Sequence, residues 1–162
     1  MRDPMTGETI ATDLEDALRT RGAESVVVVG LATDYCVKAT ALDAVRLGFR
    51  TVVLPETAIR IRKGADGEDG YSGFTMRDPM TGETIATNLE DTLRARGAES
   101  VVVVGLATDY CVKATALDAI RLGFRTLVLP GAIAAVDLEQ GDGDRALAEL
   151  RAAGVELERT VA

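Results

Sequence analysis

Residues 101–119 read VVVVGLATDYCVKATALDA, and the same letters stand at residues 26–44. Each stretch begins with four valines, a β-branched run that is typical of a strand buried on both faces. A glycine-containing turn follows, and apolar residues after the cysteine recur at the spacing of an amphipathic helix. A strand, a turn and a helix in this order indicate an α/β fold with a parallel sheet.

The repeat extends beyond this stretch. A shift of 75 positions aligns residues 1–55 with 76–130. The two copies differ only at Asp13/Asn88, Ala17/Thr92, Thr20/Ala95, Val45/Ile120 and Val52/Leu127. Near-identity over this length indicates a recent duplication, a recombination or a constructed chain, because solenoid repeats of about 20 to 50 residues usually diverge further.

The pattern predicts one α/β domain over 1–162, with a three-layer α/β/α, mainly parallel, Rossmann-like architecture. Its expected parts are a duplicated β-α-β segment at 1–58, a lysine-bearing loop at 59–75 and a C-terminal half at 76–162. Each copy should supply a helix, a strand, the cysteine turn with its helix, and a second strand. These elements are expected in copy two at 88–97, 101–104, 111–122 and 126–129, with a tail helix at 144–153, a last strand near 155–158, and a further strand at 56–62.

Composition excludes several classes of protein. The net charge of −8 argues against a nucleic-acid surface, which needs a basic patch. Apolar runs are too short to span a bilayer and the start resembles no signal peptide, so we expect a cytoplasmic protein with no membrane contact. The sequence has no histidine, which removes Ser-His-Asp and Cys-His catalysis and the commonest transition-metal ligand. We therefore expect no metal site and no cofactor.

Both cysteines follow a predicted strand and precede a predicted helix. Free N–H groups at a helix N-terminus stabilise a thiolate and can hold the oxyanion formed when it attacks a carbonyl. The alternative is that Cys36 and Cys111 are small apolar residues packed under the sheet. Lys63, between a predicted strand and a polar glycine-rich loop, favours the nucleophile because a nearby cation stabilises the thiolate.

RKGADGEDGYSGF at 62–74, together with 101–119, resembles the nicotinamidase branch of the isochorismatase-like cysteine hydrolases, over about residues 61–162. The resemblance implies hydrolysis of nicotinamide, or of a related small amide, to the acid and ammonia through a cysteine thioester. Such an activity belongs to NAD salvage. It implies that Cys111 is the nucleophile and Lys63 the lysine of the catalytic triad.

The resemblance also implies the surroundings of the nucleophile. The main-chain amides of Ala107 and Cys111 would form the oxyanion hole, with a cis peptide bond at Leu106–Ala107. Tyr71 and Phe74 match the YSGF segment that the family keeps beside its substrate.

The sequence departs from the family in its N-terminal half. The family's aspartate motif on the first strand and its metal-binding segment have no counterpart here, and activity is expected to be impaired. If copy one replaces the first β-α-β unit and completes the sheet, Gly30 stands where the base would be, and Asp34 is the only nearby carboxylate to nominate. Cys36 has no lysine before it in its own copy, so we interpret it as structural.

Two other interpretations compete with an amide hydrolase. The first is a catalytically inactive or engineered scaffold built from a duplicated half-fold. The second is a thiol redox protein, which needs a resolving cysteine that the spacing does not supply. Two identical units and open sheet edges also predict a homo-oligomer or a segment-exchanged dimer.

Overall fold

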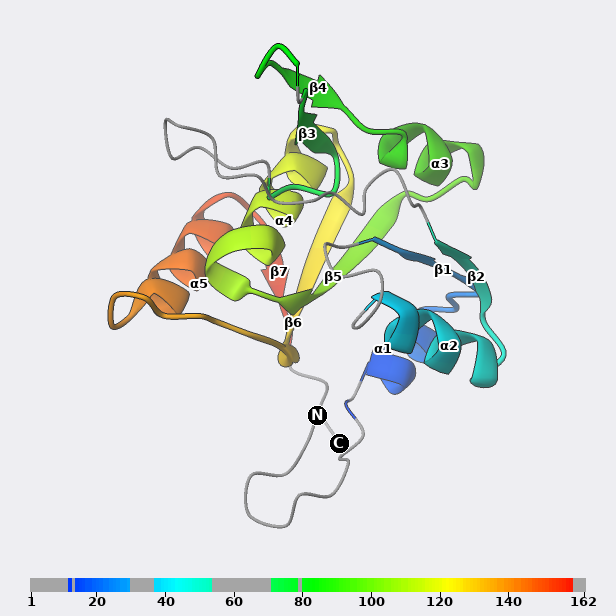
Figure 1. The fold of residues 1–162 in the computed structure, drawn as a ribbon. Coiled ribbons are helices and arrows are strands. Elements are labelled where there is room, and N and C mark those ends of the chain that lie inside the picture. The colour runs from blue at the N-terminus through cyan, green and yellow to red at the C-terminus, as the bar shows by residue number, and fades with distance from the viewer. Residues whose placement is uncertain (1–11, 13, 30–36, 54–70, 79, 159–162) are drawn as a thin grey trace.

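The fold is an α/β arrangement of short parallel strands and covering helices (Figure 1). In the computed structural model of the protein, the described residues are 12, 14–29, 37–53, 71–78 and 80–158. Copy one contributes α1 (Leu14–Thr20), β1 (Ser25–Val28), α2 (Lys38–Arg46) and β2 (Arg50–Val53). The rest contributes β3 (Thr75–Arg77), β4 (Thr84–Ala86), α3 (Leu89–Ala95), β5 (Ser100–Leu106), η3 (Thr108–Val112), α4 (Lys113–Arg121), β6 (Arg125–Ala134), α5 (Asp142–Ala152) and β7 (Glu156–Leu157).

The strands form two parallel sheets and one hairpin. β1 pairs with β2, and β5, β6 and β7 form a second parallel sheet in that order. The predicted parallel pairing is confirmed. Within the described residues, however, β2 pairs only with β1, so no strand of copy one is hydrogen-bonded to the β5–β6–β7 sheet.

Three layers are clearest around β6, where successive side chains point to opposite faces. Val128 packs with Ala116 of α4 and Leu150 of α5 on one face. Leu127 and Leu129 pack on the other face, against α1. Helices therefore cover both faces of this sheet, as the predicted α/β/α architecture requires.

The two copies share their cores. Leu14 and Ala17 of α1 lie in a cluster with Val102, Val104 and Leu127 of copy two. The counterpart of α1 in copy two is α3, and its Leu89 and Leu93 lie in a cluster with Val27, Val29 and Val52 of copy one. The first helix of each copy thus packs against strands of the other copy, which ties the two halves together through apolar contacts.

Contacts of one arginine are nevertheless the same in the described parts of both copies. Arg19 stacks over Phe49 at 5.0 Å and donates to the carbonyl oxygen of Leu47 at 2.7 Å. Arg94, its counterpart, stacks over the ring of Phe124 at 4.8 Å and donates to the oxygen of Leu122 at 2.7 Å. Identical letters therefore make identical short-range contacts.

The β3–β4 hairpin was not expected from the sequence. Thr75 pairs with Ala86 in an antiparallel register. The turn is closed by Asp78, whose carboxylate accepts N–H bonds from Met80 at 2.7 Å and Thr81 at 3.1 Å. Its strands are only three residues long, too short to give a recognisable alternation of apolar and polar residues. The predicted strand at 56–62 lies outside the described residues.

The tail was predicted closely, with different bounds. α5 begins at Asp142 rather than at residue 144, and Gly154, with φ of 90°, follows its end. β7 covers two residues instead of four. β6 continues past residue 129 because Ile133 and Ala134 pair with the end of β5, after an irregularity between Val103 and Gly105.

The start of α5 gives a pH-dependent contribution to stability. The Asp142 carboxylate accepts the N–H of Glu139 at 2.9 Å and pairs with Arg145, and these bonds lower the pKa of Asp142. A lowered pKa stabilises the fold above the ordinary aspartate pKa of about 3.9, and the contribution is lost as pH falls through the folded value. We expect Asp142→Asn to lower Tm by roughly 1–3 °C at neutral pH. Calorimetry should show the difference shrinking below about pH 3; a difference independent of pH would contradict this account.

Candidate active site

The candidate site is the turn between β5 and α4. β5 ends at Leu106, and the peptide bond between Leu106 and Ala107 is cis, as the family resemblance implied. The carbonyl oxygen of Ala107 accepts N–H bonds from Tyr110 at 3.1 Å and Val112 at 3.0 Å. The second bond spans five residues, so the chain enters α4 through the wider turn η3, which contains Cys111. Cys111 thus lies where a strand ends and a helix begins, the predicted place for a nucleophile.

Aromatic side chains lie beside this turn. Cys111 is half-buried and forms no disulfide. The ring of its neighbour Tyr110 meets the ring of Tyr71 edge to face, with centroids 5.1 Å apart and planes at 65°. Tyr71 therefore lies next to the turn that contains Cys111. Its contact with a substrate stays a prediction.

The main chain of Gly73, two residues after Tyr71, is held by two threonine hydroxyls, one of them on α4. The N–H of Gly73 donates to the hydroxyl of Thr115 at 2.9 Å, and the carbonyl oxygen of Gly73 accepts from Thr87 at 2.7 Å. A Cβ at Gly73 would lie 3.2 Å from Leu89, so a larger residue would crowd this approach. The YSGF segment thus lies against the helix that follows Cys111.

Phe74 points into the core. Its side chain is buried, and its ring stacks on that of Phe124 with centroids 6.0 Å apart. The contact places Phe74 in the cluster shared by α3 and α4. The observed contact of Phe74 is its packing on Phe124 in the core. Contact between Phe74 and a bound amide stays a prediction.

The sequence interpretation missed Asp109. Its two carboxylate oxygens accept main-chain N–H bonds from Val136 at 3.1 Å and Asp137 at 3.0 Å, so it holds the segment after β6. Asp137 has φ of 52° and in turn accepts the N–H of Gly143 at 2.8 Å. Both carboxylate oxygens of Asp109 therefore accept hydrogen bonds from the main chain. Its place, two residues before the cysteine, was the signal that could have drawn attention to it.

Removing the Asp109 carboxylate should loosen the segment that follows β6. We expect Asp109→Ala to lower the free energy of unfolding by about 0.5–1 kcal/mol, because two exposed main-chain N–H groups lose a charged acceptor. Amide hydrogen exchange at Val136 and Asp137 should accelerate, while Asp34→Ala, the same substitution in copy one, should leave exchange at both amides unchanged. Equal exchange at Val136 in the wild-type protein and Asp109→Ala would show that the carboxylate does not hold the segment.

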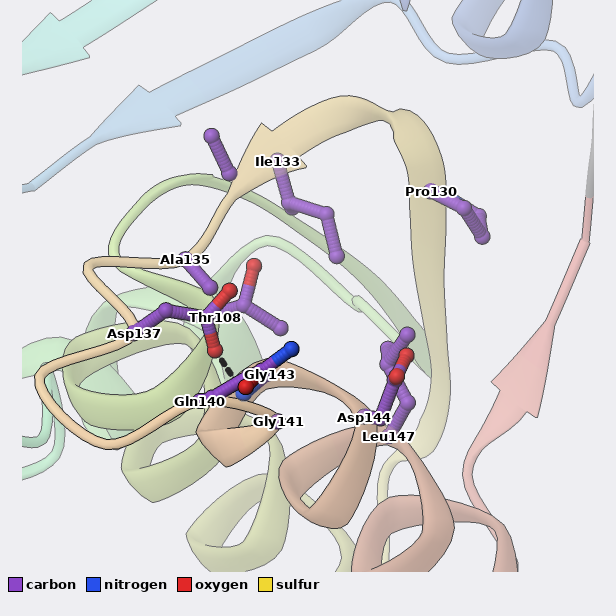
Figure 2. Close-up of a pocket in the computed structure, with 11 residues that line it drawn as sticks. Thr108, Pro130, Ile133, Ala135, Asp137, Gln140, Gly141, Gly143, Asp144 and Leu147 are labelled. Atoms are coloured by element: carbon purple, nitrogen blue, oxygen red, sulfur yellow. Dashed lines mark hydrogen bonds between the residues drawn. The ribbon is translucent and has the colours of Figure 1, made fainter.

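A cavity of about 380 Å³ lies between the end of β6 and the start of α5 (Figure 2). Thr108, Pro130, Ile133, Asp137 and Leu147 are among the residues that line it. The cavity shares Thr108 with the nucleophile turn, but Cys111 does not line it. A smaller hollow of about 220 Å³ is lined by charged residues, among them Lys113 and Glu149. Neither hollow opens onto the Cys111 thiol among the described residues.

Several predicted site residues lie outside the described residues. These are Lys63, Gly30, Asp34 and Cys36. The sequence has no histidine, and the described residues bring no three metal-ligating side chains together. In the part of the chain that the structure describes, no helix is long and apolar enough to cross a membrane.

Comparison with known proteins agrees with the geometry of the turn. The sequence profile of the isochorismatase domain matches residues 5–64 and 69–161. The chain is 39% identical to the nicotinamidase of Escherichia coli over 55% of this chain and 40% of that protein. It is 45% identical to the nicotinamidase/pyrazinamidase of Mycobacterium tuberculosis over 54% of this chain and 43% of that protein.

Solved structures give the same result for the fold. A nicotinamidase/pyrazinamidase structure from Acinetobacter baumannii superposes with a TM-score of 0.51 at 36% identity, over 69% of this chain and 48% of that one. A nicotinamidase from Staphylococcus aureus superposes with a TM-score of 0.57 at 23% identity, over 90% and 83% of the two chains, which supports the fold alone.

The chain spans less than half the length of the curated nicotinamidases that it matches. The match to the domain profile nevertheless extends over most of the chain, and the cysteine turn lies at the strand end where the resemblance predicted it. The chain therefore belongs to the nicotinamidase branch of the isochorismatase-like hydrolase family.

Proposed function

We propose that the protein is a nicotinamidase-type cysteine amidohydrolase that converts nicotinamide, or a related small amide, to the acid and ammonia. The observation that carries the proposal is the position of Cys111. It lies in the helical turn η3, which begins immediately after the cis Leu106–Ala107 bond. Relatives named for nicotinamide, pyrazinamide and maleamate hydrolysis support a small primary amide as the substrate class.

In the proposed reaction the Cys111 thiolate attacks the amide carbonyl carbon and forms a C–S bond. The main-chain N–H groups of Ala107 and Cys111 are proposed to donate to the oxyanion, which is where such donors lower the barrier most. The C–N bond then breaks, and the nitrogen leaves as ammonia after taking a proton. Water attacks the thioester, releases the acid and returns the thiol.

Lys63 is proposed to stabilise the thiolate by its charge. The family's aspartate base is missing, and Asp34 is the carboxylate that we nominate in its place. Loss of a general base typically costs about 10²- to 10⁴-fold in rate, so we propose an impaired enzyme. The proposed steps involve this chain's own residues, and none of them is routed through a metal.

A second candidate is a catalytically inactive scaffold. The absence of the aspartate motif and of every histidine favours it, as does the replacement of the family's N-terminal half by a second copy of residues 76–130. Either candidate is compatible with the family assignment.

A direct assay separates the two candidates. Purified protein is incubated with nicotinamide, pyrazinamide or maleamate, and both ammonia and the matching acid are quantified. An enzyme should release equal amounts of both, and an acid-quenched sample should carry an acyl adduct on the Cys111 peptide by mass spectrometry. No product above the buffer rate with any of the three amides would leave the scaffold as the better account.

We also propose that the protein is cytoplasmic and takes part in NAD salvage. We further propose that it forms a homo-oligomer or a segment-exchanged dimer. The shared cores of the two copies favour exchange, because a helix that packs on the other copy within one chain can do so between chains. Light scattering during size-exclusion chromatography measures the mass in solution directly. A monomer mass at all concentrations would contradict the oligomer.

A further inference from the structure

An apolar surface of copy one is left exposed in the structure. We call it the α2–β2 face, and it consists of Ala41, Leu42 and Val45 of α2 with Val53 of β2. Leu42 is 46% exposed, Val45 60% and Val53 37%. Large apolar side chains rarely gather on one exposed surface unless that surface binds a ligand or a partner.

The same surface in copy two is covered. Its counterparts are Ala116, Leu117, Ile120 and Val128, and they differ in identity only at Ile120. They pack against Leu147, Leu150, Val155 and Leu157 of the tail. Val128 is 0% exposed as a result, whereas Val53, the same residue in copy one, is not covered. Copy two therefore shows what kind of segment this surface accepts.

Charges around the covered surface match as well. Lys113 lies 3.1 Å from Glu149 of α5, and Arg125 lies 3.0 Å from Glu156 of β7. Copy one presents the same two cations as Lys38 and Arg50, and Arg50 also lies 3.4 Å from Glu24 of its own copy. Lys38 is exposed. The α2–β2 face thus carries two cations where an acidic helix and strand would place their glutamates.

The strand edge completes the match. β7 pairs in parallel with β6 at Leu127 and Val128. Val52 and Val53 stand at the same register in β2 and, within the described residues, pair with β1 alone. An unpaired edge of this kind is a template for an added strand.

We propose that the α2–β2 face is a docking site for a separate polypeptide segment with the pattern of α5–β7. Such a segment is an amphipathic helix with leucines three residues apart and a glutamate between them. A glycine turn and a two-residue strand follow, with a second glutamate in the strand. The apolar residues would cover Leu42, Val45 and Val53, and the glutamates would pair with Lys38 and Arg50. The proposal does not depend on any catalytic activity.

The test uses the full chain and a labelled synthetic peptide of residues 138–158, with binding and stoichiometry measured by fluorescence anisotropy and calorimetry. We expect one peptide per chain. Val45→Asp should weaken binding at least tenfold, because it places a charge in the apolar contact with the peptide. Val45 is exposed in the free chain, so the substitution should leave the fold intact. Lys38→Glu should weaken it about threefold, as expected for an exposed ion pair. A peptide carrying Glu149→Lys should restore binding to Lys38→Glu.

The repeat supplies the matched control. Lys113→Glu changes the same residue in copy two and should leave peptide affinity unchanged. Loss of binding with Lys113→Glu but not with Lys38→Glu would mean that the peptide displaces the chain's own tail, and the proposal would be wrong. No binding, or binding indifferent to Val45→Asp, overturns it too. A dimer of the chain alone that Val45→Asp dissociates would assign the face to a second copy instead.

Discussion

Cys111→Ala should reduce release of ammonia from nicotinamide to the rate of buffer alone, a loss of at least about 10³-fold if the wild-type chain is active. The reason is chemical: alanine cannot form the thioester, so no covalent intermediate divides the hydrolysis into two easier steps. The fold should be retained, because Cys111 is half-buried and makes no disulfide. Ammonia and nicotinate are measured over time, with circular dichroism to check folding.

Cys36→Ala is the matched control for this prediction. Cys36 stands in the same letters, GLATDYCV, but has no lysine before it in its own copy. We expect Cys36→Ala to keep the wild-type rate. Equal rates for the wild-type protein and Cys111→Ala would refute the nucleophile, and a loss of activity in Cys36→Ala alone would transfer that role to copy one.

Val128→Ala should lower the free energy of unfolding by about 2 kcal/mol. Two methyl groups are lost from a side chain that is 0% exposed between α4 and α5, and a cavity remains in a packed core. Chemical denaturation followed by circular dichroism gives the change. The effect should appear in the denaturation midpoint, with little change in the slope.

Val53→Ala makes the same substitution at the repeated position. Val53 is 37% exposed, so we expect less than about 1 kcal/mol. A difference between the two variants measures the stabilisation that α5 and β7 add to one copy. Equal losses of unfolding free energy in the two variants would mean that Val53 is covered in solution.

Much of the fold followed from local pattern. Four valines in a row, a turn and an amphipathic helix were sufficient to predict β1, β5, α2 and α4, and the tail helix was displaced by two residues at its start. The β3–β4 hairpin was not predictable in this way, because its strands are short and its stability rests on the Asp78 turn and on β3–β4 pairing.

The candidate site was only partly predictable. Cys111 and the cis Leu106–Ala107 bond were expected from the motif. That Asp109 holds the segment after β6, and that Phe74 stacks on Phe124, depend on residues distant in sequence. Long-range contacts of this kind have no periodic signature. The roles of Lys63, Tyr71 and the oxyanion donors stay predictions.

The sequence by itself determined the family, the position of the cysteine turn and the order of most strands and helices, because these depend on residues close together in the chain. It could not determine that two identical segments differ in burial. Val53 and Val128 are the same residue in nearly identical sequence, and one is exposed while the other is in the core. Only the tertiary structure decides this, because a single α5–β7 tail packs on one of two equivalent faces.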